Sequence, residues 1–404
     1  MTVGWWIWVV LLLLVAAVWA GRNREVSRAR REQHPLDERS CDGPPDPPPM
    51  VSVLIAAKDE EANIETAVRT MMQQDYPRYE LIVINDRSTD RTRDILDRLE
   101  AEYAVACNGR LKVLHVEQLR AGWFGKNNAM REGMELAKGE WLCFSDADCT
   151  QTSTRTLSVA MRYAIQTGTD FLSVLPVLEM RSLWERIIQP VCGAVMVFWF
   201  HPKRVNDPSH HAAYANGAFM LMTRETYEAI GGHEAVKTEV NEDMHMARRA
   251  KQSGRRLTVV QNDGLYRVRM YAGFAQIWRG WSRIFYGCFG SFRRLFVSML
   301  FLLITNVFPY ASATVAGLVT AARGWSAAGP WRVVAIAAGV AVAMHLVVIA
   351  RFYRLSRVNP WWAPTFIVGA LVCIGILLNA MLKLGGRTAT TWRGTTYRGS
   401  KVAS

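Results

Sequence analysis

Two aspartates one residue apart, Asp146 and Asp148, follow a short apolar run near the middle of this 404-residue chain. Carboxylates at this spacing can bind one hard cation together, because Mg²⁺ and Mn²⁺ prefer oxygen ligands and leave coordination sites for phosphate oxygens. A cation bound to a diphosphate neutralises the negative charge that grows as the diphosphate leaves. An Asp-X-Asp sequence is common by chance, so a metal site here needs support from the rest of the chain.

A second acidic pair, Glu242 and Asp243, stands where a helix is predicted to begin, and Gly254 is predicted to end that helix. A carboxylate at this place could act as a general base that takes the proton of an acceptor hydroxyl group. Acidic residues are also favoured in the first turn of any helix, so a purely structural role stays open.

The elements that must position these carboxylates are short buried strands that alternate with amphipathic helices. Strands are predicted at residues 51–57, 81–84, 111–116 and 141–145, and helices at 60–74, 91–106 and 127–137. This alternation is typical of a parallel α/β sheet, in which ligands bind at the carboxyl ends of the strands. Asp59 and Asp86 follow the first two strands and Asp146 follows the fourth, so we expect the carboxylates to converge on one edge.

The order of these motifs resembles that of the family 2 glycosyltransferases, over roughly residues 51–287. The motifs that carry the resemblance are Ala57-Lys58-Asp59-Glu60-Glu61, Asn85-Asp86-Arg87-Ser88-Thr89-Asp90, Gly125-Lys126-Asn127, Asp146-Ala147-Asp148 and Glu242-Asp243. The resemblance implies a GT-A-like α/β fold and inverting transfer of a sugar from a nucleoside diphosphate donor, with UDP as the commoner nucleotide. It also implies a divalent metal, Mg²⁺ or Mn²⁺.

The same resemblance implies roles for the residues that match the donor motifs. Asp59 and Asp86 would hold the nucleoside, and Glu60 would be a further substrate-binding residue beside Asp59. Asp146 and Asp148 would hold the metal, with Asp146 also facing the phosphates of the donor.

On the acceptor side, the resemblance implies that Asp243 is the base and that Glu242 is its catalytic neighbour. Lys126 would approach the donor, although a solvated loop lysine explains it equally well. Gly232, in Gly231-Gly232-His233, would face the acceptor, whereas a lone histidine such as His233 is more often structural.

The sequence Gln276-Ile277-Trp278-Arg279-Gly280-Trp281 is similar to the family's Q/RxxRW element. It departs from that element by one inserted residue, Gly280. The match implies that Gln276, Arg279 and Trp281 bind substrate near the diphosphate or the acceptor, and the insertion weakens this assignment for the last two.

Apolar runs at both ends of the chain predict helices that cross a membrane. Residues 4–20 are followed by five arginines, which favours a retained anchor with the rest of the chain in the cytoplasm. Runs at 295–320, 331–350 and 362–382 are each long enough to span a bilayer. We therefore expect a multi-pass protein of the cell membrane with a cytoplasmic catalytic domain; buried helices of a soluble protein are the alternative.

Two further apolar segments, 184–200 and 274–289, are predicted to lie in the membrane interface or to be buried. A crossing by the first would place Asp148 and Asp243 on opposite sides of the membrane. An active site beside the bilayer suggests a membrane lipid as acceptor, and the layout resembles that of glucosyltransferases acting on ceramides, hopanoids or carotenoids.

The expected organisation has five parts. They are an N-terminal transmembrane anchor (1–21), a basic and proline-rich linker (22–50), a GT-A catalytic domain with interfacial helices (51–290), three transmembrane helices (291–384) and a basic tail (385–404). Three crossings after the catalytic domain would put the tail outside, whereas its positive charge favours the cytoplasmic side.

The composition excludes other classes of protein. The formal net charge of +13 comes largely from basic residues beside apolar runs, which favours anionic lipids over nucleic acid as the partner. The seven cysteines show no paired spacing, so neither a disulfide framework nor a zinc site is expected. Three alternatives remain: a processive polysaccharide synthase, a nucleotidyltransferase, and a non-catalytic membrane scaffold with a decayed transferase domain.

Overall fold

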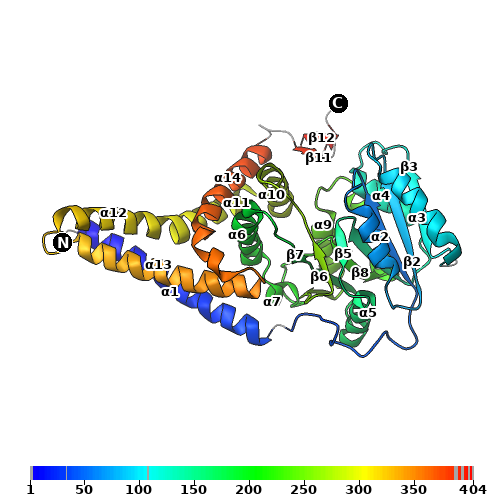
Figure 1. The fold of residues 1–404 in the computed structure, drawn as a ribbon, viewed down its shortest axis with the longest axis horizontal. Coiled ribbons are helices and arrows are strands. Elements are labelled where there is room, and N and C mark those ends of the chain that lie inside the picture. Colours follow the sequence, from blue (N-terminus) through cyan, green and yellow to red (C-terminus); the bar gives the residue numbers. More distant parts are fainter. Residues whose placement is uncertain are drawn as a thin grey trace. The chain divides into compact units, whose positions relative to one another are not determined.

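The computed structural model describes residues 3–32, 34–106, 109–385, 390–392, 395–398 and 401–402. The chain forms two compact units (Figure 1). We call residues 35–180, 196–270 and 388–404 the sheet unit, and residues 1–34, 181–195 and 271–387 the helical unit.

The sheet unit is built on seven strands in the order β3-β2-β1-β4-β8-β6-β9. They are β1 (Val51–Ala57), β2 (Tyr79–Asp86), β3 (Leu111–Val116), β4 (Trp141–Asp146), β6 (Phe171–Leu175), β8 (Phe219–Thr223) and β9 (Leu257–Gln261). The first four are parallel neighbours, as the sequence predicts. Beyond β4 the sheet is mixed, because β8 is antiparallel to both β4 and β6. The sequence predicts parallel pairing for these first four strands, and no strand was predicted past β4.

Helices lie between the strands of this unit. They are α2 (Ile64–Met72), α3 (Thr92–Ala106), α4 (Gly125–Gly133), α5 (Thr156–Thr167), α7 (Pro202–Val205), α8 (Arg224–Ala229), η1 (Glu234–Val236) and α9 (Glu242–Gln252). Of these, α2, α3, α4 and α9 overlap the helices predicted from the sequence. The expected apolar face of α2 is buried, and α4 packs against β1 and β2. A small second sheet pairs β10 (Tyr266–Val268) with β5 (Cys149–Gln151) and β7 (Val177–Leu178), and a third contains β11 (Thr390–Trp392), β12 (Thr395–Arg398) and β13 (Lys401–Val402).

The proline-rich segment before β1 is attached to the sheet unit. Leu36 forms a backbone bridge with Asn262 of the sheet unit. The Arg155 guanidinium donates to the backbone oxygens of Glu38 and Cys41, both at 2.7 Å. Farther along, the Arg162 guanidinium donates to the Pro44 oxygen at 2.9 Å and the Tyr76 hydroxyl donates to the Pro49 oxygen at 2.7 Å, so the prolines are held as well.

The helical unit contains the long apolar helices. They are α1 (Val3–Glu32), α6 (Leu183–Trp199), α10 (Phe274–Phe289), α11 (Phe292–Leu302), η2 (Leu303–Val307), α12 (Phe308–Arg323), α13 (Trp331–Leu355), η3 (Pro360–Thr365) and α14 (Phe366–Leu384). Within this unit α13 lies between α1 and α12, while α14 packs against α10 and α11 (Figure 1). α1 continues through the basic cluster to Glu32, beyond the anchor boundary expected at residue 21.

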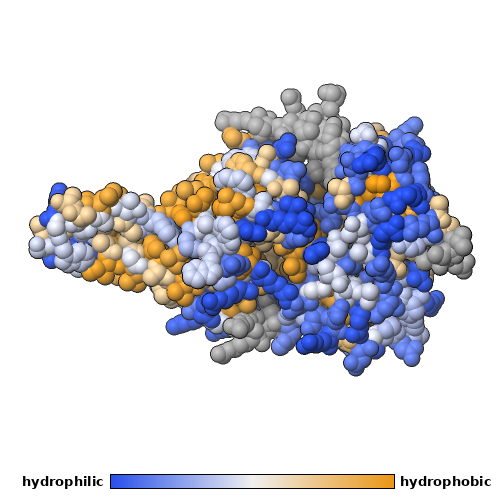
Figure 2. Space-filling view, viewed as in Figure 1, coloured by the Kyte–Doolittle hydropathy of each residue, from blue (hydrophilic) through white to orange (hydrophobic). Residues whose placement is uncertain are grey.

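Five helical stretches in the described part of the chain are long and apolar enough to cross a membrane. Four are the expected spans, and the fifth is Leu183–Val205. Large apolar side chains such as Leu13, Leu318 and Ile336 are exposed on these helices, and Figure 2 shows hydrophobic surface over them. An exposed apolar surface of this extent indicates association with a membrane.

The strands on either side of α6 belong to one sheet. β4 precedes α6 in the chain, β8 follows it, and the two are hydrogen-bonded neighbours. A single crossing by α6 would separate these strands, so the sheet supports the expectation of a buried or interfacial helix. Packing in the helical unit agrees: Ile188, Val191 and Cys192 are buried, and Gly369 of α14 has no side chain because the Ile187 carbonyl lies against it.

A polar cluster lies among the apolar helices, at the place where the helical hydrogen-bond pattern of the Phe292–Arg323 stretch changes. Residues Leu303–Val307 form a π-helical turn just before Pro309. Proline has no N–H to give to the carbonyl four residues earlier, that of Thr305. The indole N–H of Trp19 on α1 donates to this oxygen instead, at 3.0 Å. Nearby, the His345 ring is bonded by Asn306 at 2.9 Å and by Tyr310 at 3.0 Å. The backbone groups freed by the proline are thus satisfied by a neighbouring helix.

Replacement of Trp19 should therefore destabilise the helical unit more than replacement of an exposed tryptophan on the same helix. We expect Trp19→Phe to lower the unfolding free energy by about 1–2 kcal/mol, because the Thr305 oxygen loses its donor in an apolar interior. Trp6, which is 54 % exposed, provides the matched control Trp6→Phe. Thermal unfolding in detergent measures both, and equal melting temperatures would contradict the role given to Trp19.

Candidate active site

The predicted carboxylates lie at one edge of the sheet. β1 pairs in parallel with β2 on one side and β4 on the other, with Ala57 opposite Asn85 and Ala56 opposite Asp146. Asp59, Asp86 and Asp146 therefore follow or end three adjacent strands at the same edge. This is the edge at which parallel α/β sheets bind their ligands.

The loops after β1 and β2 are bonded to each other through short polar side chains. Asp59 Oδ1 accepts the Thr89 N–H at 2.8 Å, and Ser88 Oγ accepts the Asp59 N–H at 3.0 Å. Asp59 and Arg87 have φ values of 52° and 53°, which non-glycine residues rarely adopt. Backbone strain of this kind persists only where surrounding contacts enforce it, and it gathers at binding sites.

Asp86 is buried and already has a cationic partner. The Arg87 guanidinium donates to Asp86 Oδ1 at 2.7 Å and to Oδ2 at 3.0 Å. On its other side lies Gly125, the first residue of α4, where a Cβ would approach Asp86 Oδ2 to 2.5 Å. A carboxylate held from both sides in this way can accept hydrogen bonds in a fixed direction.

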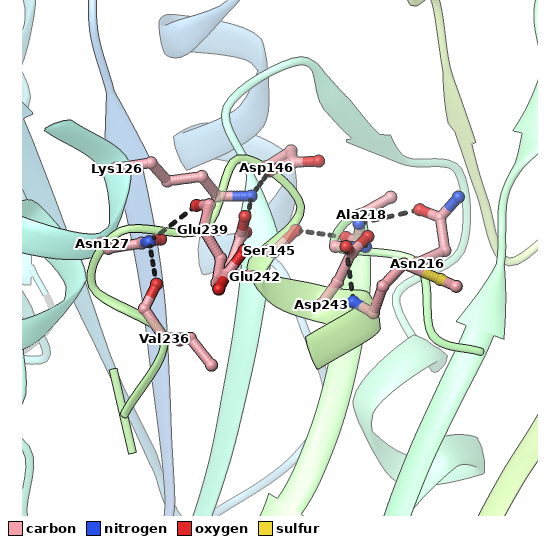
Figure 3. Close-up of polar contacts among 12 residues, drawn as sticks. Lys126, Asn127, Ser145, Asp146, Asn216, Ala218, Val236, Glu239, Glu242 and Asp243 are labelled. Atoms are coloured by element: carbon pink, nitrogen blue, oxygen red, sulfur yellow. Dashed lines mark hydrogen bonds and ion pairs between the residues drawn. The ribbon is translucent and has the colours of Figure 1, made fainter. Parts of the chain in front are cut away.

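Lys126 joins the two acidic motifs. Its Nζ lies 2.6 Å from Asp146 Oδ1 and 2.6 Å from Glu242 Oε1, so one ammonium group bridges β4 and α9 (Figure 3). Burial acts to lower the pKa of Lys126, but the carboxylates of Asp146 and Glu242 outweigh it and raise this pKa well above its usual value. The prediction of a solvated loop lysine does not hold, since 19 % of the side chain is exposed.

Asn127, next to Lys126, fixes the loop that leads into the acidic pair. Its Nδ2 donates to the backbone oxygens of Val236 at 2.7 Å and of Glu239 at 3.0 Å (Figure 3). The start of α4 therefore positions α9 by two adjacent side chains. The sequence marks Asn127 only as part of a motif and gives no sign of this contact.

Asp148 carries an unsatisfied oxygen. In the described part of the chain its Oδ1 is buried and has no hydrogen-bond partner. Burial, together with the charges of Asp146 and Glu60, raises the pKa of Asp148 to about 8. A buried carboxylate beside other carboxylates is the donor set that a hard cation needs, because the cation supplies the missing positive charge.

The geometry is compatible with a metal shared between protein and ligand. No group of three or more His, Cys, Asp or Glu side chains is arranged for a metal ion among the described residues. Mg²⁺ and Mn²⁺ sites that bind nucleotides often use one or two carboxylates and complete the shell with phosphate oxygens and water. Asp146 and Asp148 fit that pattern.

Asp243 is held by backbone donors on two sides. Its Oδ2 accepts the Gly217 N–H at 3.0 Å, and its Oδ1 accepts the Met244 N–H at 2.7 Å. Burial and the neighbouring Glu242 raise the pKa of Asp243 to about 7. A carboxyl group with this proton affinity is suited to general base catalysis near neutral pH.

The turn before β8 also contacts these residues, although none of its residues was among the predicted site residues. Asn216 accepts the Ala218 N–H through Oδ1 at 3.0 Å, and Ser145 Oγ donates to the Ala218 oxygen at 2.9 Å (Figure 3). Gly217 lies within this turn and donates to Asp243. An Asn-Gly pair directly before an apolar strand is a turn signal that could have drawn attention to it.

Gly232 and His233 have structural explanations. Gly232 has a φ of 52°, and a Cβ there would lie 2.6 Å from the Tyr227 ring. The His233 ring is buried and bonded to the Tyr227 hydroxyl at 2.9 Å, and burial, aided by Lys126, lowers its pKa to about 3. His233 is therefore neutral and structural, as expected, while contact of Gly232 with the acceptor stays a prediction.

Gln276, Arg279 and Trp281 lie on α10 of the helical unit. Gln276 accepts the Ala272 N–H at 2.9 Å, and Arg279 donates to the Ala275 oxygen at 3.2 Å. Packing explains why residue 280 is glycine, because the Tyr271 ring occupies the place that a Cβ would take. The contact of these three residues with substrate stays a prediction.

Part of the sheet unit is similar to known proteins. Residues 52–231 match the description "Glycosyl transferase family 2". This part of the chain is similar to that family. Among curated proteins, 4,4'-diaponeurosporenoate glycosyltransferase of Staphylococcus aureus is 26 % identical over 235 residues, which are 58 % of this chain and 60 % of that protein. The chain thus matches about three fifths of the length of this relative.

A solved structure has a similar fold. The mannosyltransferase PcManGT of Pyrobaculum calidifontis, solved in complex with GDP-mannose and Mn²⁺, aligns with a TM-score of 0.54 at 18 % identity. The alignment covers 83 % of this chain and 97 % of that one. The GT-A-like α/β domain expected from the sequence is confirmed, with a mixed sheet.

Loss of the Lys126 ammonium should destabilise the sheet unit, whatever the protein binds. In Lys126→Met the carboxylates of Asp146 and Glu242 face each other without a shared cation, and we expect a loss of about 2–3 kcal/mol in unfolding free energy. Lys237, which forms an exposed ion pair with Glu234, provides the control Lys237→Met with a much smaller change. Chemical unfolding measures both, and a Lys126→Met protein as stable as the control would refute the bridge.

Proposed function

We propose that this chain is an inverting glycosyltransferase that moves a sugar from a nucleotide-sugar donor to a hydroxyl group of a membrane lipid. The observation that carries the proposal is the pairing of two unlike acidic groups across the Lys126 bridge. Asp148, with its unsatisfied buried oxygen, stands beside Asp146 on one side, and Asp243, with a pKa near 7, stands on the other. Asp148 and Asp146 are suited to bind a cation beside phosphates, and Asp243 is suited to accept a proton.

The donor would lie along the sheet edge. Asp59 and Asp86 would bind the nucleoside, and Asp146 and Asp148 would hold a divalent cation beside the diphosphate. Such a cation supplies positive charge against the leaving diphosphate. The family resemblance favours UDP as the nucleotide, whereas the solved relative was crystallised with GDP-mannose, so both belong in any test.

The residues of this chain would carry the proton and orient the reactants. Asp243 takes the proton of the acceptor hydroxyl group, and the hydroxyl oxygen forms a bond to the anomeric carbon. The bond from that carbon to the diphosphate oxygen breaks on the opposite face, so the configuration is inverted and the nucleoside diphosphate leaves with the electron pair. The Gly217 and Met244 N–H groups hold the Asp243 carboxylate in place during this exchange.

A membrane lipid as acceptor is supported by the apolar helices and by the S. aureus relative, whose name describes the glycosylation of a carotenoid acid. The arginines that follow the apolar part of α1 support a protein of the cell membrane whose catalytic domain lies on the cytoplasmic side. Since the chain matches about three fifths of that relative, the lipid class is part of the proposal.

The first test is transfer in detergent with Mn²⁺ or Mg²⁺, in which UDP-sugars and GDP-sugars are offered with a total lipid extract. We expect a lipid carrying one labelled sugar that forms only with the metal. A long polymer would establish a processive synthase instead. Absence of turnover with every donor would support a non-catalytic scaffold.

Asp243→Asn should abolish transfer and keep donor binding, because the amide cannot accept the proton. The wild-type rate should rise as the pH increases through about 7, since the base acts only when deprotonated and the pKa of Asp243 is raised to that value. Asp94→Asn, at an exposed position of α3, is the matched control. Normal turnover in Asp243→Asn would show that another group is the base.

Asp148→Asn should separate metal binding from folding. The raised pKa of Asp148 favours its neutral form at neutral pH, so the isosteric amide should leave the melting temperature of the metal-free protein unchanged or higher. The increase in melting temperature produced by Mn²⁺ with a nucleoside diphosphate should disappear. Electron paramagnetic resonance of free Mn²⁺ gives a second measure, and undiminished Mn²⁺ binding would remove Asp148 from the metal site.

A further inference from the structure

Side-chain contacts fix the directions of the long helices in the helical unit. We call the half of α1 that carries Arg22, Arg24 and Arg28 the arginine end. Near this end the Trp19 indole N–H donates to the Thr305 oxygen, just before α12 begins, at 3.0 Å. Farther from it, Trp8 donates to Ser312 of α12, also at 3.0 Å. α12 therefore runs antiparallel to α1 and leads away from the arginine end.

α13 brings the chain back to the arginine end. Trp331, its first residue, packs edge-on against Trp5 near the start of α1, with the ring centroids 4.8 Å apart. Arg351, near the other end of α13, donates to Ser27 at 2.8 Å. α13 is thus parallel to α1, so α12 and α13 run in opposite directions between the same two ends.

α14 begins beside the last part of α13 and then leaves it. The Phe366 ring lies 6.2 Å from the ring of Tyr353. Beyond this contact α14 packs against α10, α11 and η2, and among the described residues it shows no comparable packing with α1, α12 or α13. Figure 1 shows α14 pointing away from the direction that those three helices share. The apolar cluster between them, which includes Leu12, Ala316 and Val334, contains no described residue of α14.

α14 is fixed to α6, which does not cross the membrane. The Ile187 carbonyl of α6 lies where a side chain at Gly369 would be, and the sulfur atoms of Cys192 and Cys373 are 3.7 Å apart. These two contacts place α14 parallel to α6 and directly against it. The strands before and after α6, β4 and β8, are neighbours in one sheet, which rules out a single crossing by α6. A helix packed along α6 lies at the same depth in the membrane.

α10 holds the second half of α14. The Trp278 ring lies where a side chain at Gly375 would be, and Asn379 donates to Ser282 Oγ at 3.0 Å. The apolar stretch Phe292–Arg323 begins only after α10 has ended. α14 is therefore packed against two helices that the chain forms before that stretch leads away from the arginine end.

The exposed face of α14 is an apolar stripe. Val368, Leu371, Leu378 and Leu382 are 43–51 % exposed and lie on one side of the helix. Residues on its other faces, such as Ala370, are buried. An apolar helix that is mostly buried in protein does not need to span a bilayer, because one exposed stripe can face the acyl chains of a single leaflet.

We infer that α14 lies in the leaflet at the arginine end without crossing the bilayer, and that the basic tail lies on the same side of the membrane as those arginines. The stretch Phe292–Arg323 and α13 are then the two crossings that follow the sheet unit. Two crossings return the chain to its starting side, which agrees with the positive charge of a tail that contains no acidic residue. The inference goes beyond the proposed function and does not depend on the reaction.

Thiol labelling from the two sides of the membrane tests the position of the tail. Cys41 and Cys107 are first replaced by serine, because the other cysteines are buried. Ser400→Cys is then compared with Ser40→Cys, at an exposed site after the arginine end, and with Ser326→Cys, at an exposed site between α12 and α13. With a membrane-impermeant maleimide, Ser400→Cys should react as Ser40→Cys does, in inverted vesicles and not in intact cells. Reaction of Ser400→Cys from the same side as Ser326→Cys would overturn the inference.

Spin labels test the depth of α14 itself, in the same background. Nitroxide labels are attached to Val368→Cys, Leu371→Cys, Leu378→Cys and Leu382→Cys, and collisions with oxygen are compared with collisions with a water-soluble nickel complex. A matched set on α13 covers the same length at exposed positions, with Val333→Cys, Ile336→Cys, Val340→Cys and Val347→Cys. The ratio of oxygen to nickel collisions should pass through a maximum along α13 and should not do so along α14. A maximum in the middle of α14 as high as that of α13 would show that α14 crosses the bilayer. Neither measurement requires turnover, so failure of the proposed reaction leaves this test valid.

Discussion

The ammonium group of Lys126 is the interaction on which the rest of the site depends. Four carboxyl groups, those of Asp146, Asp148, Glu242 and Asp243, stand at one edge of the sheet, and like charges at this proximity repel one another. Lys126 meets Asp146 and Glu242 at 2.6 Å each, and so joins the end of β4 to the start of α9. The next residue, Asn127, fixes the loop before α9, so the first turn of α4 organises both acidic motifs.

This bridge leaves two carboxyl groups with different environments. Burial and like charges raise the pKa of Asp148 to about 8. One buried oxygen of Asp148 has no hydrogen-bond partner among the described protein groups. The pKa of Asp243 is raised to about 7, but its oxygens accept hydrogen bonds from two backbone N–H groups. Two carboxyl groups in such different environments can have different roles in one reaction. One can bind a cation and the other can accept a proton.

The helical unit satisfies its own polar groups by similar means. Pro309 interrupts a long apolar helix and frees a carbonyl oxygen, which accepts the indole N–H of Trp19 from another helix. In an apolar environment such an oxygen has no water to bond, so the contact also specifies how α1 packs. The bonding of β4 to β8, before and after α6, places a comparable constraint on α6. The side of the membrane on which the basic tail lies stays a prediction.

The sequence by itself determined the local elements and the positions of the acidic motifs. Strands Val51–Ala57 and Leu111–Val116 were predicted to the residue, because short runs rich in Val, Leu and Ile favour strands. Convergence of Asp59, Asp86 and Asp146 followed from parallel pairing of neighbouring strands. The order of the motifs also carried the resemblance to family 2 glycosyltransferases.

Only the tertiary structure decided what those residues contact. The antiparallel β8, the bridge from Lys126 to Glu242 and the loop held by Asn127 join segments about a hundred residues apart, and no local pattern encodes such pairings. Gly217 shows the limit most clearly. Its sequence indicates a turn, but a Cβ at this residue would lie 3.1 Å from Lys126 Nζ and 3.6 Å from Asp243 Oδ2, and this crowding exists only once distant elements have packed together.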